Sequence, residues 1–98
     1  MPDDWRLTPA AQGDFGKIYD FGADRWSEDQ AVRYARELRE VFSLLASQPR
    51  MARERPEFGH GIRVHPHGAH AVFYRAVRDG IEIVRIAHGR SDWRVLFD

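Results

Sequence analysis

The spacing of apolar residues predicts a short strand followed by an amphipathic helix at the start of the chain. Residues 5–7 alternate in character, as in a strand. Thr8 and Pro9 then form a helix start, with Thr8 as N-cap and the proline at the first helical position. Gly13 and Gly16 weaken this helix by about 1 kcal/mol each relative to alanine, so it needs a partner surface. Its apolar stripe consists of Ala11, Phe15, Ile18, Tyr19, Gly22 and Trp26.

A second, more regular amphipathic helix follows directly. Ser27 and Gln30 have the spacing of a capping box, and Pro49 ends the helix near Ser47 or Gln48. Two such helices with a tight connection fold back as an antiparallel hairpin, and we expect both apolar stripes to face the core. The second stripe consists of Ala31, Tyr34, Ala35, Leu38, Val41, Phe42 and Leu45.

Beyond residue 49 the pattern changes from helical to strand-like. Residues 49–61 combine proline, glycine and charge and predict a loop. Strands are predicted over residues 61–65, 69–77 and 81–87, with Asp79-Gly80 as a two-residue hairpin turn. The order predicts an α+β fold: a short N-terminal strand, an antiparallel helix hairpin, then an antiparallel β-meander with the helices on one sheet face.

The hairpin turn also predicts a register for the last two strands. On one face Tyr74 lies opposite Arg85, Ala76 opposite Ile83 and Val72 opposite Ala87; on the other, Phe73 pairs with Ile86, Arg75 with Val84 and Ala71 with His88. Neither face is plainly polar. The face away from the helices is therefore either a binding surface or is covered by the C-terminal tail.

Composition predicts one globular domain over residues 1–98. No segment approaches the about 20 apolar residues that span a bilayer, the N-terminus lacks signal-peptide order and cysteine is absent, so we expect a cytoplasmic protein without a membrane partner. Net charge is zero, which argues against direct DNA binding. Fourteen of the fifteen basic residues are arginine, which reflects either a GC-rich genome or a surface suited to carboxylate or phosphate.

Several short motifs follow one another in a specific order between Leu7 and Asp92. They are Leu7-Thr8-Pro9-Ala10-Ala11, Asp14-Phe15, Ile18-Tyr19, Arg25-Trp26, Gln30-Ala31, Tyr34, Leu38, Phe42, Leu45-Ala46, Pro49-Arg50, Gly61-Ile62-Arg63, His70, Phe73-Tyr74-Arg75, Ile81-Glu82-Ile83-Val84-Arg85-Ile86, His88-Gly89-Arg90 and Asp92. In this order they resemble the ParE branch of the RelE/ParE toxin superfamily. The chain departs from the family at Gly13 and Gly16, where helix formers are usual, and at Ala87, where a larger apolar residue is usual.

The resemblance implies the toxin of a type II toxin–antitoxin system. Such toxins are neutralised by an antitoxin, often of the ParD type, whose C-terminal segment wraps the toxin, and operator DNA is then contacted only through the antitoxin. The best-studied ParE toxins poison DNA gyrase, whereas RelE relatives of the same fold cleave mRNA on the ribosome, so the fold alone does not decide the target. The residues expected to bind the antitoxin are Tyr34, Leu38, Arg63, Tyr74 and Arg85.

A ribonuclease site would need an acid, a base and cations for the phosphate. The candidates are Arg63, His70, Tyr74, Arg85 and His88. RelE-type nucleases, however, concentrate lysine and arginine on the sheet and place a tyrosine or histidine near the C-terminus. Here the single lysine, Lys17, lies in the first helix and the tail has neither residue, so we expect a non-enzymatic inhibitor.

No metal or cofactor is predicted. His65, His67 and His70 are close in sequence, but Pro66 and Gly68 indicate a strand end and a turn from which the side chains diverge. No carboxylate lies between Arg63 and Asp79 to complete a metal site.

The C-terminal tail, residues 90–97, combines arginine with aromatic and apolar residues, the types enriched at interface hot spots. It is the segment predicted to contact the target, and the alternative is that Trp93, Leu96 and Phe97 pack back on the sheet. The residues assigned to target binding are His88, Arg90, Asp92, Trp93 and Arg94.

Overall fold

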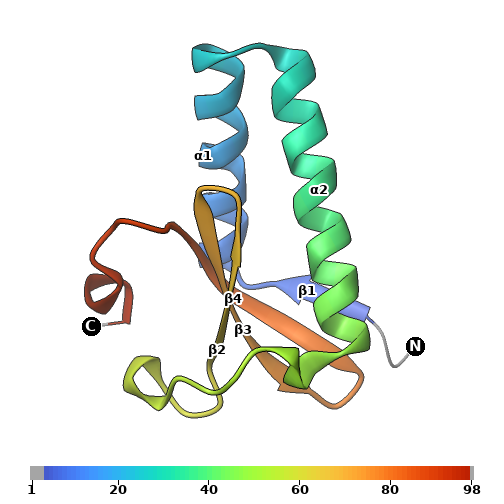
Figure 1. The fold of residues 1–98 in the computed structure, drawn as a ribbon, viewed down its shortest axis with the longest axis vertical. Helices are drawn as coiled ribbons and strands as arrows, with labels where there is room; N and C mark the ends of the chain where they lie inside the picture. Colours follow the sequence, from blue (N-terminus) through green and yellow to red (C-terminus); the bar gives the residue numbers. More distant parts are fainter. Residues whose placement is uncertain (1–3, 98) are drawn as a thin grey trace.

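The computed structural model describes residues 4–97. The two ends of the predicted domain, Met1–Asp3 and Asp98, lie outside the described residues. The elements are those expected, in the expected order (Figure 1). They are β1 (Asp4–Leu7), α1 (Pro9–Arg25), α2 (Glu28–Ser47), β2 (Arg63–His67), β3 (His70–Val77) and β4 (Gly80–His88), with short 3-10 segments η1 (Pro49–Met51), η2 (Pro56–Phe58) and η3 (Trp93–Phe97).

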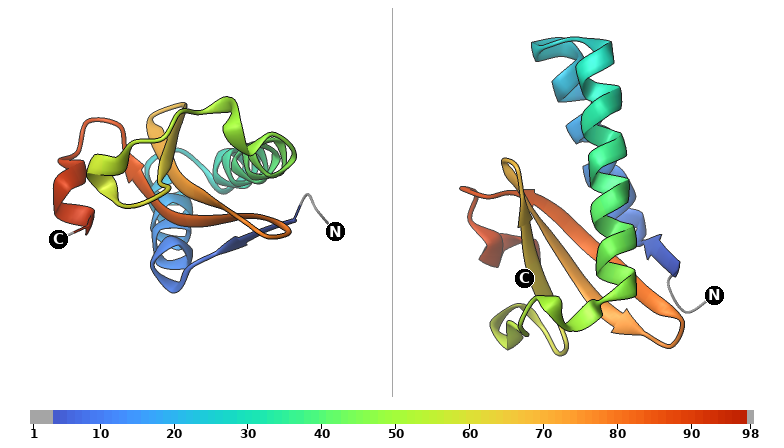
Figure 2. Two further views of the ribbon diagram at one scale, coloured as in Figure 1. Left: turned by 90° about the horizontal axis from the view of Figure 1, so that it is seen from below. Right: turned by 45° about the vertical axis from the view of Figure 1, so that its right-hand side comes forward.

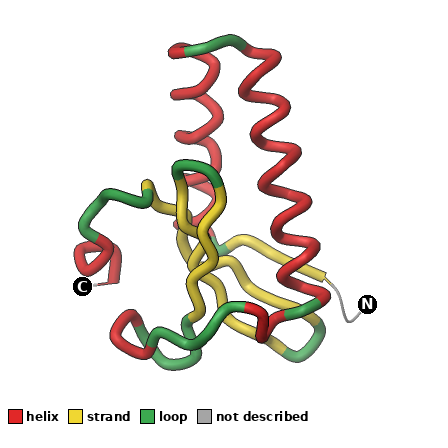
Figure 3. Tube along the Cα trace, viewed as in Figure 1, coloured by secondary structure: helices red, strands yellow, loops and turns green. Residues whose placement is uncertain are grey.

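Both helices begin at the predicted caps. The Thr8 hydroxyl accepts a hydrogen bond from the Ala11 amide at 3.1 Å, and the Ser27 hydroxyl accepts one from the Gln30 amide at 3.1 Å. The predicted antiparallel hairpin is confirmed, and α2 ends at Ser47 as expected. The hairpin runs well past the end of the sheet (Figures 1 and 3). The distal half of each helix therefore has no sheet beneath it.

The four strands form one mixed sheet in the order β1-β4-β3-β2. The meander is antiparallel as predicted, while β1 pairs in parallel with β4. The helices cover one face of this sheet, and the C-terminal segment lies on the other side (Figure 2). The predicted α+β class, with helices on one face, is confirmed.

The predicted register of β3 and β4 is wrong. Val77 pairs with Gly80, so the turn residues are Arg78 and Asp79. Gly80 instead begins β4, with φ 154°, and a Cβ there would collide with the Asp4 carbonyl oxygen, so the approach of β1 requires glycine. The observed pairs replacing the predicted ones are Ala71–Ala87, Val72–Ile86, Phe73–Arg85, Tyr74–Ile83, Arg75–Glu82 and Ala76–Ile81.

A bulge explains the rest of the difference in register. It falls between Phe73 and Tyr74 and leaves Val84 as the extra residue on β4. The bulge lies where β1 ends, since β1 pairs with β4 only as far as Ile83. The Thr8 amide donates to the Ile83 carbonyl at 3.0 Å and the Thr8 hydroxyl to the Val84 carbonyl at 2.8 Å. The start of α1 thus continues the hydrogen bonding of the strand that precedes it.

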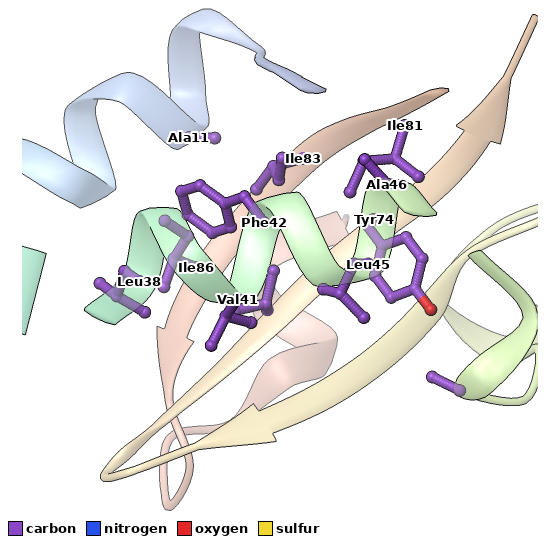
Figure 4. Close-up of a cluster of buried hydrophobic side chains, with 12 residues drawn as sticks. Ala11, Leu38, Val41, Phe42, Leu45, Ala46, Tyr74, Ile81, Ile83 and Ile86 are labelled. Carbon is purple, nitrogen blue, oxygen red and sulfur yellow. The ribbon is translucent and has the colours of Figure 1, made fainter. Parts of the chain in front are cut away.

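The main core lies between the helices and the sheet (Figure 4). Helix α2 supplies most of its helical residues, whereas α1 buries only Ala11 fully. Phe15 and Ile18 of α1 are only partly buried against this core. Helix α1 therefore contributes less to this core than α2 does. The buried members are Ala11, Leu38, Val41, Phe42, Leu45, Ala46, Ala52, Val72, Tyr74, Ile81, Ile83 and Ile86.

A second apolar cluster fills the opposite sheet face. The Phe73 ring is fully buried there, with its centroid 5.2 Å from that of Trp93 and 5.3 Å from that of Phe97. Phe58 and Leu96 complete the cover. The tail therefore packs back on the sheet, which decides between the two alternatives left by the sequence for this face.

The outer edge of β2 is partly occupied by the preceding loop. Glu54 forms an isolated antiparallel bridge with Arg63, and the Arg55 amide donates to the Ile62 carbonyl at 2.7 Å. Further along the strand, Pro66 has no amide hydrogen to donate. The accessible edge is therefore short.

Candidate functional site

An apolar groove of about 660 Å³ lies where the helix hairpin projects beyond the sheet. Both helices form its walls, and the adjoining ends of β3 and β4 close it. Its main apolar and aromatic lining residues are Phe15, Ile18, Tyr19, Phe21, Trp26, Ala31, Tyr34, Ala35 and Leu38.

The groove exists because the apolar stripe of α1 continues beyond the surface that could bury it. Phe21 is 60% exposed and Trp26 is 67% exposed, which is unusual for large apolar side chains. Arg25 lies over the Phe21 ring at 5.4 Å from its centroid, so the tip of the hairpin is both aromatic and basic. A continuous apolar surface of this kind marks an interaction site.

The sheet end of the groove is polar and rich in histidine. His70 and His88 line it, and their ring centroids are 5.8 Å apart. The Tyr34 hydroxyl lies 2.6 Å from His70 Nδ1 and 3.2 Å from the His67 carbonyl oxygen. Gly68, with φ 56°, brings the β2–β3 turn so close to Tyr34 that a Cβ there would lie 2.9 Å from its hydroxyl oxygen.

Burial shifts the ionisation of this end of the groove. The pKa of His70 is lowered mainly by desolvation, and further by the positive charges of His88 and His67. The pKa of Tyr34 is raised by desolvation and by the charge of Glu37. The neutral forms of His70 and Tyr34 are therefore favoured.

Asp14, on the α1 wall, is fully engaged. Its carboxylate accepts hydrogen bonds from Arg85 Nε at 2.8 Å, from Arg85 Nη2 at 2.9 Å and from the Ile86 amide at 3.0 Å. The hydrogen bond to Asp14 also raises the pKa of Arg85. This pair fixes α1 against β4 and leaves Arg85 unavailable to a ligand.

A second cleft, of about 820 Å³, lies between η1, β2 and β3 at the other end of the sheet. Two of the arginines that line it, Arg63 and Arg75, bind other groups of the protein itself. Arg63 Nη1 donates to the Ala52 carbonyl at 2.6 Å, and Arg75 pairs with Glu82 at 2.7 Å. Arg63 therefore anchors the loop that follows α2.

The structure does not bring the five ribonuclease candidates together. Arg63 pairs with Tyr74 across two strands, whereas His70 pairs with His88 at the far end. Four residues of strand, about 13 Å, separate His70 from Tyr74. The Tyr74 hydroxyl donates to the Pro49 carbonyl at 2.7 Å, and its side chain is fully buried. Arg85, the fifth candidate, is the partner of Asp14.

Of the residues assigned to antitoxin binding, Tyr34 lines the groove with accessible surface. Leu38 forms part of the lining but is 1% exposed, and Tyr74 is 0% exposed, so both serve the core. Arg63 and Arg85 are held by internal partners, as described above. The sequence analysis left Phe21 out of the apolar stripe of α1 and expected Trp26, within the stripe, to face the core. Both side chains are largely exposed, because the sheet ends before it reaches them.

The residues assigned to target binding form two sets. Trp93 packs on Phe73, and its indole Nε1 donates to the His88 carbonyl at 3.0 Å. Arg90 and Arg94 are exposed, and Arg94 pairs with the exposed Asp92 at 3.2 Å. The outer surface of the tail is therefore charged, and its role in target binding stays a prediction.

Of the three histidines predicted to diverge, His65 and His67 lie on β2, whereas His70 begins β3 and pairs with His67 across the turn. No group of three or more His, Asp or Glu side chains within residues 4–97 is arranged to hold a metal ion. Across the same residues, neither helix has the length and apolar character needed to cross a bilayer.

Comparison with known proteins identifies the family to which the chain is similar. Residues 5–93 match the family model described as "ParE toxin of type II toxin-antitoxin system, parDE". The chain is 40% identical over 93 residues to Toxin ParE1 of Mycobacterium tuberculosis, covering 94% of this chain and 95% of that protein. It is 36% identical over 84 residues to Toxin ParE1 of Caulobacter vibrioides, covering 86% of each. A solved structure titled "Chromosomal ParDE TA system from P. aeruginosa" shares the fold, with a TM-score of 0.72 and 21% identity over 87% of this chain and 94% of that chain.

Proposed function

The chain belongs to the ParE family of toxins of type II toxin–antitoxin systems, and we propose that it arrests growth in the cytoplasm by inhibiting DNA gyrase until a ParD-like antitoxin neutralises it. The groove between the helices and the end of the sheet is the proposed antitoxin site. The observation that carries this proposal is the exposed apolar stripe of α1, which the toxin's own fold leaves unburied.

An antitoxin segment would complete the packing that α1 lacks. It would bury Phe21 and Trp26, whose aromatic surface is a typical interface anchor. Such burial would also stabilise α1, which contains Gly13 and Gly16 and contributes only Ala11 to the fully buried core. Partner binding and toxin stability are therefore expected to be coupled.

A non-catalytic mode of action is supported by the arrangement of the polar residues. Tyr74 is buried, Arg85 is paired with Asp14, and the two histidines lie about 13 Å further along β3 and β4 from Tyr74. Acid–base cleavage of RNA requires these groups at one phosphate. Inhibition through a surface makes no such demand, and a RelE-like mRNA endonuclease is the outcome that the following experiment would reveal.

Expression of the chain alone is expected to stop growth, and co-expression with its antitoxin is expected to restore growth and yield a stable complex. Pulse-labelling after induction should show that DNA synthesis falls before protein synthesis, and purified toxin should inhibit supercoiling of relaxed plasmid by gyrase. An earlier fall in protein synthesis, with mRNA cut at discrete positions, would overturn the gyrase proposal. A harmless, monomeric chain that captures no antitoxin would overturn the whole assignment.

A second test asks whether the C-terminal tail, residues 90–97, contacts the target. Because Trp93, Leu96 and Phe97 cover Phe73, deleting residues 93–98 would remove part of a core. The Arg90→Glu/Arg94→Glu variant changes only the outer surface, where ion pairs contribute about 0–1 kcal/mol to folding. If the tail contacts the target, this variant should lose toxicity while keeping its fold and its antitoxin.

The matched control is Arg33→Glu/Arg36→Glu on the exposed side of α2, away from the tail and the groove. It carries the same charge change and should stay toxic. Toxicity on induction, circular dichroism and antitoxin pull-down are measured together for both variants. A folded Arg90→Glu/Arg94→Glu chain with full toxicity would contradict a role for the tail.

A further inference from the structure

The end of the groove next to the sheet is basic and rich in histidine, and its chemistry indicates which kind of segment can bind there. We propose that Lys17, His70 and His88 receive an acidic side chain of the antitoxin segment, so that the complex tightens as the pH falls. This rests on the proposed function, since it assumes that the groove holds the antitoxin. Beyond the proposed function, it specifies an acidic residue in the antitoxin segment and a dependence of the complex on pH.

The first support is that this end of the groove lacks a counter-ion of its own. The nearby carboxylate of Asp14 is held by Arg85 and the Ile86 amide. Glu37 Oε1 lies 3.3 Å from His67 Nε2, a contact that is an ion pair only when His67 is protonated, and Glu37 does not line the groove. Within residues 4–97, Lys17, His70 and His88 form no salt bridge. A carboxylate arriving with a partner would meet three nitrogen-bearing side chains without competing with an internal acid.

The second support is that His70 can take up a proton without losing its position. When the ring is neutral, the Tyr34 hydroxyl can donate to His70 Nδ1 across 2.6 Å. When the ring is protonated, the same hydroxyl can accept from Nδ1 and donate to the His67 carbonyl oxygen at 3.2 Å. Protonation therefore changes the charge at the groove while the ring stays in place.

The third support is the electrostatic environment of His70, to which charged and titratable groups of α1, α2, β2 and β4 contribute. Tyr34 and Glu37 approach from α2, His67 from β2, His88 from β4, and Lys17 and the neutralised Asp14 from α1. Burial is the main reason why the pKa of His70 is lowered, and the charges of His88 and His67 lower it further. A partner carboxylate reverses the balance by stabilising the protonated ring.

The sign of the pH effect follows by linkage. Free toxin binds the His70 proton less readily than an unfolded chain, so acidification below about pH 6.5 destabilises the free fold. The complex, with a carboxylate beside the ring, binds the proton more readily than the free toxin does. Lower pH therefore favours the complex over the free toxin.

The expected partner segment is thus amphipathic, with an apolar side and an acidic residue at one end. Its apolar side fills the groove along Ile18, Phe21 and Trp26, and an aspartate or glutamate follows at the end that reaches the sheet. Charge complementarity, and not apolar area alone, sets the direction in which the segment lies.

The test measures antitoxin affinity for the purified toxin at pH 7.5, 6.5 and 5.5. The wild-type complex is expected to tighten by about tenfold over this range, the equivalent of one unit of pKa difference between bound and free toxin. The His70→Gln/His88→Gln variant should lose most of that gain, whatever its affinity at pH 7.5. His65→Gln is the matched control, because His65 also has a lowered pKa from burial but does not line the groove.

The outcomes separate this inference from the proposed function. Affinity that is unchanged or weaker at pH 5.5, or a gain that survives in His70→Gln/His88→Gln, would overturn the acidic contact while leaving the antitoxin assignment intact. Absence of binding at all three pH values, together with no rescue of growth, would overturn the antitoxin assignment itself.

Discussion

Replacing Phe42 with alanine is expected to lower the free energy of unfolding by about 3–5 kcal/mol. The Phe42 ring is fully buried, and its centroid lies 5.0 Å from that of Trp5 in β1 and 6.2 Å from that of Phe15 in α1. It thus connects α2 to the first strand and the first helix. Figure 4 shows the Phe42 ring among the other buried side chains of the core. At the lower end of typical domain stability, about 5 kcal/mol, a loss at the upper end of this range would leave up to about half of the free toxin unfolded.

Chemical denaturation followed by circular dichroism measures this loss. Leu44→Ala is the control, because Leu44 lies on the same helix but is 43% exposed and should change stability by much less. Equal losses for Phe42→Ala and Leu44→Ala would mean that α2 is not packed as described. Antitoxin should partly rescue Phe42→Ala, since binding of the folded state adds to its stability.

The second large effect concerns the groove. The Phe21→Ala/Trp26→Ala variant is expected to weaken antitoxin binding by at least about 100-fold, since buried aromatic anchors contribute about 2 kcal/mol or more each. Stability of the free toxin should change little, because these side chains are 60% and 67% exposed. In cells the variant should therefore be toxic and poorly neutralised.

Calorimetry with purified antitoxin measures the affinity. Val32→Ala/Leu44→Ala removes two apolar side chains, each 43% exposed, from α2 positions outside the groove and should bind normally. If both double variants bind like the wild type, the antitoxin occupies a different surface. If both lose binding equally, the effect is a general one of helix stability.

Much of the fold is predictable because its signals are local. Thr8 and Ser27 cap their helices through bonds to residues three positions ahead, so the sequence alone contains both partners. The turn from helical to strand-like spacing after Pro49 is local as well. These signals place both helices and the three later strands within a few residues of their true bounds.

The register of β4 is not predictable in this way. Gly80 looks like a turn residue, but its lack of a side chain serves the approach of Asp4, which is 76 positions away. At the bulge, the Val84 carbonyl likewise accepts a hydrogen bond from the distant Thr8 hydroxyl. Both features lie along the parallel contact between β1 and β4, and the sequence near residue 80 contains no signal that predicts this contact.

The candidate site is only partly predictable for a related reason. Tyr34 belongs to an apolar stripe and His70 to a strand, and each could have been core or surface. Whether Phe21 is buried depends on the length of the sheet relative to the helices, a property of the assembled fold. Tyr74 illustrates the opposite case, since a polar side chain in a family motif proves to be buried, with its hydroxyl on the Pro49 carbonyl.

The occupied edge of β2 bears on how the toxin behaves at high concentration. A long bare edge strand is a template on which further copies add strands and polymerise into fibrils. Here the Glu54–Arg63 bridge takes one end of that edge, and Pro66 lacks the hydrogen needed to extend a ladder near the other. Overproduced toxin is therefore expected to fail, when it fails, through amorphous clumping of its exposed aromatic tip and not through amyloid growth.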